Sequence, residues 1–396
     1  MGSANPKKVS TLGTIAIMSM FFIAMGFTVV TPAMAKFAEA FPNNNFVLIS
    51  TLPTLFIVIG TFLSGSVAGK KLSYKTLAVT GSLLFLIGGV APAYISGFNA
   101  ILVCRAVFGL GIGFMIPLGN ALVIGNFEGQ KRASLLGYGT LFMNFGGILF
   151  QMLGGILADI NWQMTFWAHT LVIFALIFSF LLPEPPKADT AQTASAPKEK
   201  LGKPVWVIAL LLLIYNMINY PIMMNLSILF IERNAGGATA AATALSLFTV
   251  AGCVAGLLFG NIFKALRRFC IPLGFTLCAL GAVLVRFGTS GLLMTMGLIL
   301  IGFGFSVILP SFMTWMGIST PPSTVAMAAS IVMALMNLGG FVCAYWLEII
   351  NAIAGETIIT PINIAIGFFI LMVAVFLIYN PYKSMAPPPL NEVKKN

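Results

Sequence analysis

A charged residue and several glycines stand together inside a stretch that is apolar enough to cross a membrane. The stretch reads RAVFGLGIGFMIPLGN, residues 105–120. The residues that share one helical face, within about 80°, are Arg105, Gly109, Gly113 and Asn120. A guanidinium is costly in hydrocarbon, so it should face a protein interior or a water-filled cavity. The pattern predicts either an arginine that binds anions or couples to protons, or one that hydrogen-bonds carbonyls of neighbouring helices.

Other polar side chains interrupt the apolar segments where they could line a cavity. The stretch YNMINYPIMMNLS, residues 215–227, carries a polar stripe about 100° wide, and Pro221 removes a backbone hydrogen bond within it. Such a stripe beside a helix break points to a binding site, although asparagines also join neighbouring helices at about 1 kcal/mol each. The candidate substrate-binding residues are Arg105, Asn120, Asn144, Gln151, Asn216, Asn219, Tyr220, Met223, Trp315 and Asn337.

Two further ionisable residues join Arg105 as candidates for coupling transport to protons. His169 is the sole histidine, and histidine titrates near neutral pH. Glu348 lies some 25 residues into its apolar segment, where a solvated carboxylate at the membrane surface is the alternative. The cysteine spacing gives no metal site, and no phosphate-binding glycine loop is present, so we expect no metal and no cofactor.

Membrane-spanning helices must position these residues. Of the 396 residues, 59% are hydrophobic and only 8% are charged, whereas soluble domains carry about 25% charged residues. Because no basic face stands on a soluble element, a nucleic-acid partner is excluded. Twelve segments have the roughly 20 apolar residues that a crossing needs. The expected helices are 11–35, 46–69, 75–96, 98–125, 133–158, 162–183, 205–231, 239–263, 270–288, 291–317, 323–348 and 358–380.

The apolar segments fall into two groups separated by a polar stretch. We predict an N-terminal six-helix bundle at 1–183, a linker at 184–204, a C-terminal six-helix bundle at 205–380 and a tail at 381–396. Seventeen Lys and Arg residues fall on the side of the linker and both termini, and the other side has only Lys36, Arg233 and Arg286. The positive-inside rule therefore predicts that the linker and both termini are cytoplasmic.

The two groups are related by an internal repeat with an offset of 193 residues. Gly109, Gly111 and Pro117 recur as Gly302, Gly304 and Pro310. The run MNFGG at 143–147 recurs as MNLGG at 336–340. Because six crossings return the chain to its starting side, these are two parallel six-helix repeats, and transporters built in this way bind substrate between them.

The sequence resembles the major facilitator superfamily of secondary transporters over nearly its whole length. The loop after the second helix, GSVAGKKLSYK at 65–75, keeps the family's first glycine, alanine and basic character, with Gly69 at the acidic position. The fourth-helix pattern is present at Arg105, Gly109 and Gly111, and the fifth-helix pattern is kept at Gly146, Gly154 and Gly155. The resemblance implies the family's twelve-helix fold and alternating access, and a sixth helix on the outside of the bundle.

We therefore expect an all-α membrane protein that is a secondary transporter and not an enzyme. Likeness to twelve-helix drug-efflux members favours proton-coupled efflux of amphiphilic organic compounds. Uptake or exchange of a small organic anion is the alternative, since Arg105 has no nearby acid. A sensor that binds without transport and a membrane-embedded enzyme remain as other classes. The expected partners are a small-molecule substrate, protons and the lipid bilayer, with the chain acting as a monomer in the cytoplasmic membrane.

Overall fold

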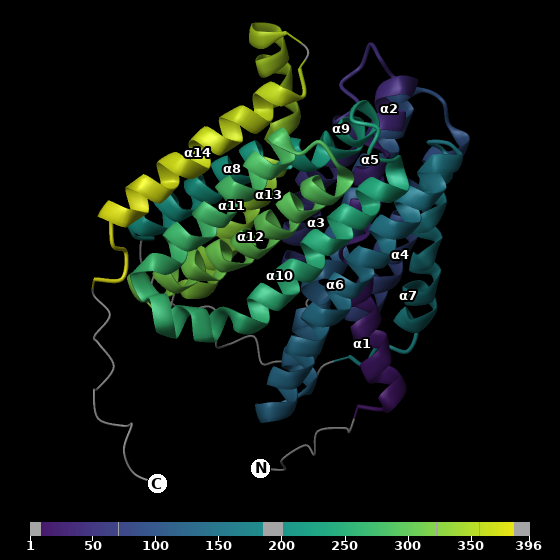
Figure 1. Cartoon of the computed structure of the whole chain (residues 1–396). Helices are drawn as coiled ribbons and strands as arrows, with labels where there is room; N and C mark the ends of the chain where they lie inside the picture. Colours follow the sequence, from purple (N-terminus) through teal and green to yellow (C-terminus); the bar gives the residue numbers. More distant parts are fainter. Residues whose placement is uncertain (1–8, 70, 185–200, 322–323, 356, 384–396) are drawn as a thin grey trace, which may run out of the picture.

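The computed structural model describes residues 9–69, 71–184, 201–321, 324–355 and 357–383, in which every regular element is helical (Figure 1). The first half holds α1 (Thr11–Ile23), the 3-10 helix η1 (Gly26–Ala33), α2 (Met34–Ala40), α3 (Leu48–Val67), α4 (Tyr74–Val90), η2 (Ala91–Tyr94), α5 (Phe98–Asn126), α6 (Gly129–Ile160), η3 (Met164–Leu171) and α7 (Val172–Ser179). The second half holds α8 (Lys203–Met224), α9 (Leu226–Glu232), α10 (Ala238–Leu266), η5 (Arg267–Phe269), α11 (Cys270–Phe287), α12 (Gly291–Ser319), α13 (Val325–Ala354) and α14 (Ile359–Ile378).

These helices confirm the predicted twelve crossings. Within the described residues, ten spans are long and apolar enough to cross a membrane; one of them, Ala238–Phe287, contains both α10 and α11, and Met164–Ser179 supplies a shorter crossing. The first crossing extends to Ala40, beyond the expected end at 35, because the 3-10 segment around Pro32 is followed by another helical stretch. Most of the predicted linker and tail, 185–200 and 384–396, lies outside the described residues.

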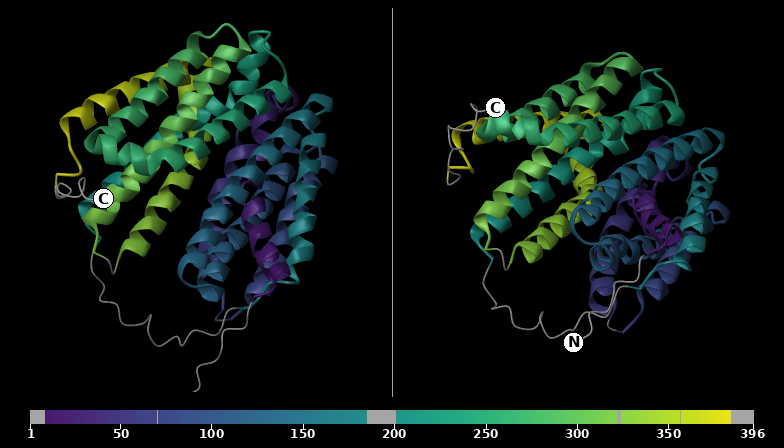
Figure 2. Two further views of the ribbon diagram at one scale, coloured as in Figure 1. Left: turned by 60° about the horizontal axis from the view of Figure 1, so that its bottom comes forward. Right: turned by 90° about the horizontal axis from the view of Figure 1, so that it is seen from below.

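The two halves repeat the same packing at the offset of 193 residues. Helix α5 at 98–126 corresponds to α12 at 291–319 without any change in length. In the first half α5 packs between α3 and α4, and in the second half α12 packs between α10 and α11. Helices α7 and α14 lie at opposite edges of the molecule (Figure 1), and the halves form two lobes side by side (Figure 2).

Glycines allow backbones to touch within each half. A Cβ on Gly88 would collide with the backbone nitrogen of Phe108, and one on Gly281 would collide with the carbonyl oxygen of Gly297. Both approaches are closer than any real Cβ contact, so these repeated positions require glycine. Small residues that permit close backbone approach are the usual means of helix association in membranes. The α4–α5 and α11–α12 pairs are therefore fixed units.

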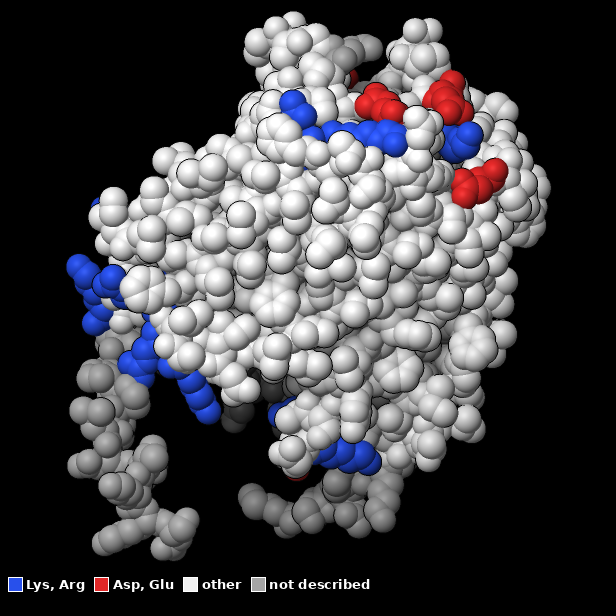
Figure 3. Space-filling model, in the orientation of Figure 1, with Lys and Arg blue, Asp and Glu red and all other residues white. Residues whose placement is uncertain are grey.

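The two ends of the bundle differ in charge. At one end, where α1 begins and α14 ends, lie Lys131, Arg132, Lys264, Arg267 and Arg268; we call it the basic end, and the opposite end the far end. On the face shown in Figure 3, charged side chains lie at the two ends and the wide band between them is uncharged. This band matches the hydrocarbon layer that the apolar helices predict.

The described hydrogen bonds between the halves gather at the far end. They join Ala35 to Ser227, Asn45 to Ala344, and Asp159 to Ala238 and Thr239. In the far part of α6, a Cβ on Gly155 would collide with the Cβ of Ala242 on α10. Toward the basic end of the same helices, a Cβ on Gly137 or on Gly256 would meet no described atom within 4 Å. The halves are thus in contact at the far end.

Candidate functional site

The seam between α6 and α10 brings the two halves together in antiparallel register. Asp159 hydrogen-bonds the start of α10, Gly155 lies on Ala242, and the sulfur of Met152 is 3.9 Å from Thr243 Oγ1. One helical turn on α6 thus matches one turn on α10. By this register, Gln151 and Ser246 are the corresponding residues one turn nearer the basic end.

Gln151 and Ser246 are the polar groups of this seam that find no partner among the described residues. Their side chains are 8% and 6% exposed, and Gln151 Oε1 and Ser246 Oγ are buried without any hydrogen bond to the described part of the chain. A buried polar atom that lacks a partner costs about 1–3 kcal/mol, so such atoms call for an explanation. On α6, Gln151 lies between Gly147, which packs on Met25, and Gly155, which packs on α10. The pair therefore stands at a junction of both halves, where a bound molecule would meet it.

Arg105 lies inside the first half, away from this seam. It is fully buried, its Nε donates to the carbonyl of Ile49 at 2.8 Å, and its Nη1 lies 3.3 Å from His169 Nε2. The guanidinium carbon stands 4.2 Å from the centre of the Phe108 ring, and Nη2 has no partner in the described ranges. The buried partner expected for Arg105 is thus present as a carbonyl, an imidazole and an aromatic ring.

The contacts of His169 define its protonation state. Its Nδ1 lies 2.9 Å from the carbonyl oxygen of Phe166, which can only accept, so Nδ1 carries a hydrogen. The guanidinium can only donate, so Nε2 offers its lone pair to Arg105. His169 is therefore neutral in this arrangement, and a second proton on Nε2 would break the contact with Arg105. Although it belongs to the sixth crossing, His169 is fully buried.

The polar side chains of α8 do not meet at one site, and each has different neighbours. Asn216 Nδ2 donates to the Met336 carbonyl at 2.8 Å and so joins α8 to α13 within the second half. Asn219 is one turn beyond Tyr215, which faces the interior of that half, and its Oδ1 is buried without a described partner. Tyr220 packs on Gly340. The helix breaks at Asn225, after Pro221, where α9 begins as a separate element.

The remaining candidates of α8 and α12 lie within the second half. Met223 is half-buried and packs against the hydrophobic core there. Trp315 is 4% exposed and packs on Phe312 and Phe376. Trp315 is thus enclosed by residues of the second half. No described contact joins Met223 or Trp315 to Gln151.

The other predicted residues are spread along the molecule. Asn144 is half-buried on α6, and Asn337 donates to the Met333 carbonyl of its own helix at 3.0 Å. Asn120 is exposed seven residues beyond Gly113, about 10 Å nearer the basic end. Glu348 is exposed near the far end of α13.

The sequence alone does not single out Ser246 and Asp159, two residues that the seam makes prominent. Ser246 stands in an alanine-rich helix, where a serine gives no separate signal. Asp159 lies in the last turn of α6, where the sequence does not distinguish its carboxylate from an ordinary surface charge. The glycines Gly154 and Gly155, a few residues earlier, mark a close helix contact and were the available signal for this seam.

Comparison with known proteins agrees with the fold. The model of the Major Facilitator Superfamily matches residues 16–344. The quinolone resistance protein NorA of Staphylococcus aureus is 25% identical over 176 residues, which are 43% of this chain and 45% of that protein. The multidrug transporter protein MdtP of Bacillus subtilis is 26% identical over 176 residues, 43% of this chain and 32% of that protein. The matches thus span less than half the length of these relatives.

Among solved structures, a mutant of the nucleoside transporter NupG has a TM-score of 0.78 at 13% identity, covering 92% of this chain and 98% of that one. This likeness is one of fold. The chain belongs to the major facilitator superfamily, and it is a multi-pass membrane transporter rather than an enzyme.

Proposed function

We propose that this protein exports neutral, amphiphilic organic molecules in exchange for protons by alternating access between its two halves. The observation that carries the proposal is the seam between α6 and α10, where Gln151 of one half and Ser246 of the other each hold a buried oxygen without a described hydrogen-bond partner. An amide and a hydroxyl suit the few polar atoms of a largely apolar substrate.

The charge of the proposed site supports a neutral substrate. The described Asp and Glu residues lie in loops or within the last two turns of a helix: Glu39, Glu128, Asp159, Glu184, Glu232 and Glu348. No described carboxylate therefore stands beside Gln151 and Ser246 to balance a cationic substrate. Likeness to NorA and MdtP, a quinolone resistance protein and a multidrug transporter, supports efflux as the direction.

Orientation follows from the distribution of basic residues. We place the basic end in the cytoplasm, with the units 1–183 and 205–380 rocking about the seam and the linker at 184–204 between them. The structure then corresponds to a state closed to the outside. We propose the monomer as the working unit, because one chain supplies both halves that rock against each other.

Proton coupling is assigned to His169 and Arg105. A proton on His169 Nε2 cannot coexist with the Arg105 contact, so proton arrival would rearrange the core of the first half. Glu348 is exposed near the far end of α13. As a proton carrier it would exchange protons with the outer face alone.

Transport in proteoliposomes tests this function. Proteoliposomes that hold the protein in inside-out orientation should take up neutral amphiphilic compounds. This uptake should depend on an imposed proton gradient and should stop when an ionophore collapses the gradient. Flux that is independent of the gradient would contradict proton coupling. Binding without flux would instead make the protein a sensor.

Exchange of a small organic anion is the second candidate, because Arg105 Nη2 is buried without a described partner and no described carboxylate pairs with it. The rings of Phe108 and Phe166 pack on the Arg105 guanidinium inside the first half, so the group is enclosed by its own half, which favours the first proposal. Counterflow of organic anions that is lost on Arg105→Lys would reverse this preference.

A further inference from the structure

The start of α10 lacks a cap of its own. The residue before the helix is Gly237, which has no side chain to accept a hydrogen bond, and the first backbone N–H groups of a helix have no partner within it. Those donors usually bind a side chain of the preceding residues. Here they bind a side chain of the other half.

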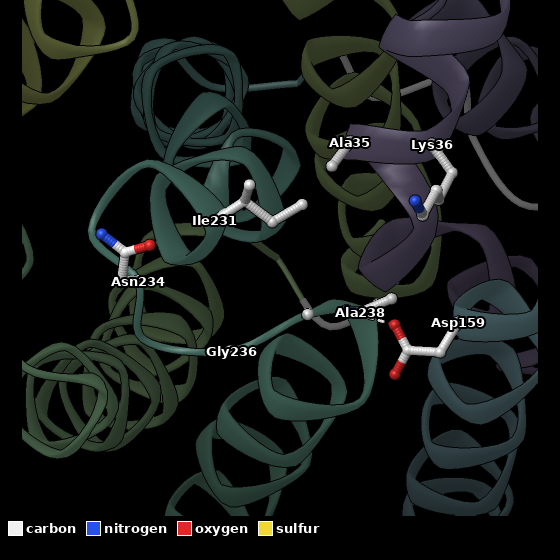
Figure 4. Close-up of a pocket in the computed structure, with 8 residues that line it drawn as sticks. Ala35, Lys36, Asp159, Ile231, Asn234, Gly236 and Ala238 are labelled. Carbon is white, nitrogen blue, oxygen red and sulfur yellow. Dashed lines mark hydrogen bonds between the residues drawn. The ribbon is translucent and has the colours of Figure 1, made fainter.

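Asp159, at the far end of α6, supplies that cap. Its Oδ1 accepts from Ala238 N at 2.9 Å, and its Oδ2 accepts from Thr239 N at 3.0 Å and from the Thr239 hydroxyl. A carboxylate that accepts several N–H bonds at a helix N-terminus also meets the positive end of the helix dipole. Figure 4 shows Asp159 reaching toward the start of α10, with Lys36 of α2 across the same hollow.

The glycine before α10 is needed for this approach. A Cβ on Gly237 would lie 2.7 Å from Asp159 Oδ1, closer than real Cβ contacts occur. The same residue therefore leaves α10 without a local cap and makes room for one from the other half.

The symmetry-related seam has no such charge. At the offset of 193 residues, Asp159 corresponds to Ala352 and Ala238 to Asn45. The contact there is a neutral one, from Asn45 Nδ2 to the Ala344 carbonyl at 3.2 Å. The charged cap belongs to the α6–α10 seam and is not a general property of the repeat.

We infer that Asp159 is a positioning residue of the transport cycle, which holds the outer side closed by capping α10 across the two halves. The inference rests on the proposed alternating access. When the halves part on the outside, Ala238 N and Thr239 N lose their acceptor and the carboxylate returns to water. The cap therefore favours the outward-closed state over the outward-open one.

A native cysteine reports the state of the outer side. Cys343 on α13 is fully buried in a hydrophobic cluster that consists mainly of first-half residues, so it should become reachable when the halves part. The test measures its labelling by a membrane-impermeant maleimide added from outside to right-side-out vesicles. Peptide mass spectrometry separates Cys343 from the other four cysteines of the chain.

Asp159→Ala should raise the labelling rate of Cys343 by about 5- to 30-fold, the population shift that the loss of a helix cap produces. Asp159→Asn keeps one acceptor oxygen and should give a smaller rise. Glu39→Ala is the matched control, because Glu39 is an outer carboxylate that pairs with Lys36 of its own helix at 3.4 Å. It should leave labelling unchanged.

Two results would overturn the inference: labelling of the Asp159→Ala protein at the wild-type rate, or an equal rise in the Glu39→Ala protein. If the Ala variant is not monodisperse on gel filtration, the Asn variant and Thr239→Val decide by the same readout. Labelling needs no substrate, so a response without flux supports the cap while contradicting the proposed transport. Flux without a labelling response contradicts the cap alone.

Discussion

Arg105 and His169 form a pair in the interior of the first half, with Nη1 3.3 Å from Nε2, and the pair contains no carboxylate. Removing the imidazole would leave two nitrogens of a buried guanidinium without acceptors, since Nη2 already has none among the described residues. His169→Ala should therefore lower the free energy of unfolding by about 1–3 kcal/mol. Thermal unfolding in detergent measures the loss. His169→Gln, whose side-chain oxygen can accept from Nη1, should recover part of it, and equal stability of the Ala and Gln variants would contradict this account.

The same pair predicts a separation between two kinds of transport. If His169 carries the proton and does not touch substrate, His169→Gln should abolish accumulation driven by a proton gradient but keep substrate counterflow, which needs no net proton movement. Both are measured in the same proteoliposome preparation. Loss of counterflow together with driven transport would place His169 in the binding site instead.

Gln151 and Ser246 should control apparent affinity. Gln151→Leu or Ser246→Ala removes one hydrogen bond to a bound substrate, which is worth about 0.5–1.5 kcal/mol, and KM should rise by roughly 2- to 10-fold. The maximal rate should change little. Ser66→Ala is the control, since Ser66 is exposed and its hydroxyl donates to the Leu63 carbonyl of its own helix. A rise in KM for Ser66→Ala that equals those at the seam would contradict the site.

Gly155 should be intolerant of a side chain in the outward-closed state. A Cβ there would overlap the Cβ of Ala242 and would lie 2.7 Å from the carbonyl oxygen of Ala238, and relieving such overpacking costs about 1–3 kcal/mol. Gly155→Ala should therefore shift the protein toward the outward-open state and slow transport. Gly137→Ala is the matched control on the same helix, because no described atom lies within 4 Å of the added carbon. Equal transport rates for the two variants would contradict the seam geometry.

Arg233 should matter for stability rather than for transport. Its guanidinium donates to the carbonyls of Val285, Arg286 and Gly288, which end α11, and thereby fastens α9 to that helix. Arg233→Ala should lower the free energy of unfolding by about 1–3 kcal/mol, since a cation at a helix C-terminus satisfies otherwise free carbonyls. Thermal unfolding in detergent measures the loss. Lys36→Ala, at the same end of the molecule, should change unfolding little.

Much of the fold could be predicted from the sequence because segment length and repetition are direct signals. Twelve apolar runs specify twelve crossings, and the offset of 193 residues that relates Gly109 to Gly302 also relates the packing of α5 to that of α12. The first crossing was harder, because Pro32 interrupts the regular pattern and the chain continues as a short helix.

The candidate site was only partly predictable, since a helical stripe tells which residues share a face but not what that face meets. Arg105 was expected to face a cavity or a partner, and the partner, His169, is 64 residues away on another crossing. Gln151 is predictable from the sequence as an amide in an apolar helix. Ser246 is not, because its significance depends on lying opposite Gln151 across two halves of the chain.

The glycine contacts within each half have a mechanical consequence. Where Gly88 meets the backbone of α5 and Gly281 meets that of α12, the two helices of each pair pack backbone against backbone. Each such pair should therefore move as one rigid body. When the halves rotate about the seam near Gln151, the displacement of the helix ends at each membrane face grows in proportion to their distance from the seam.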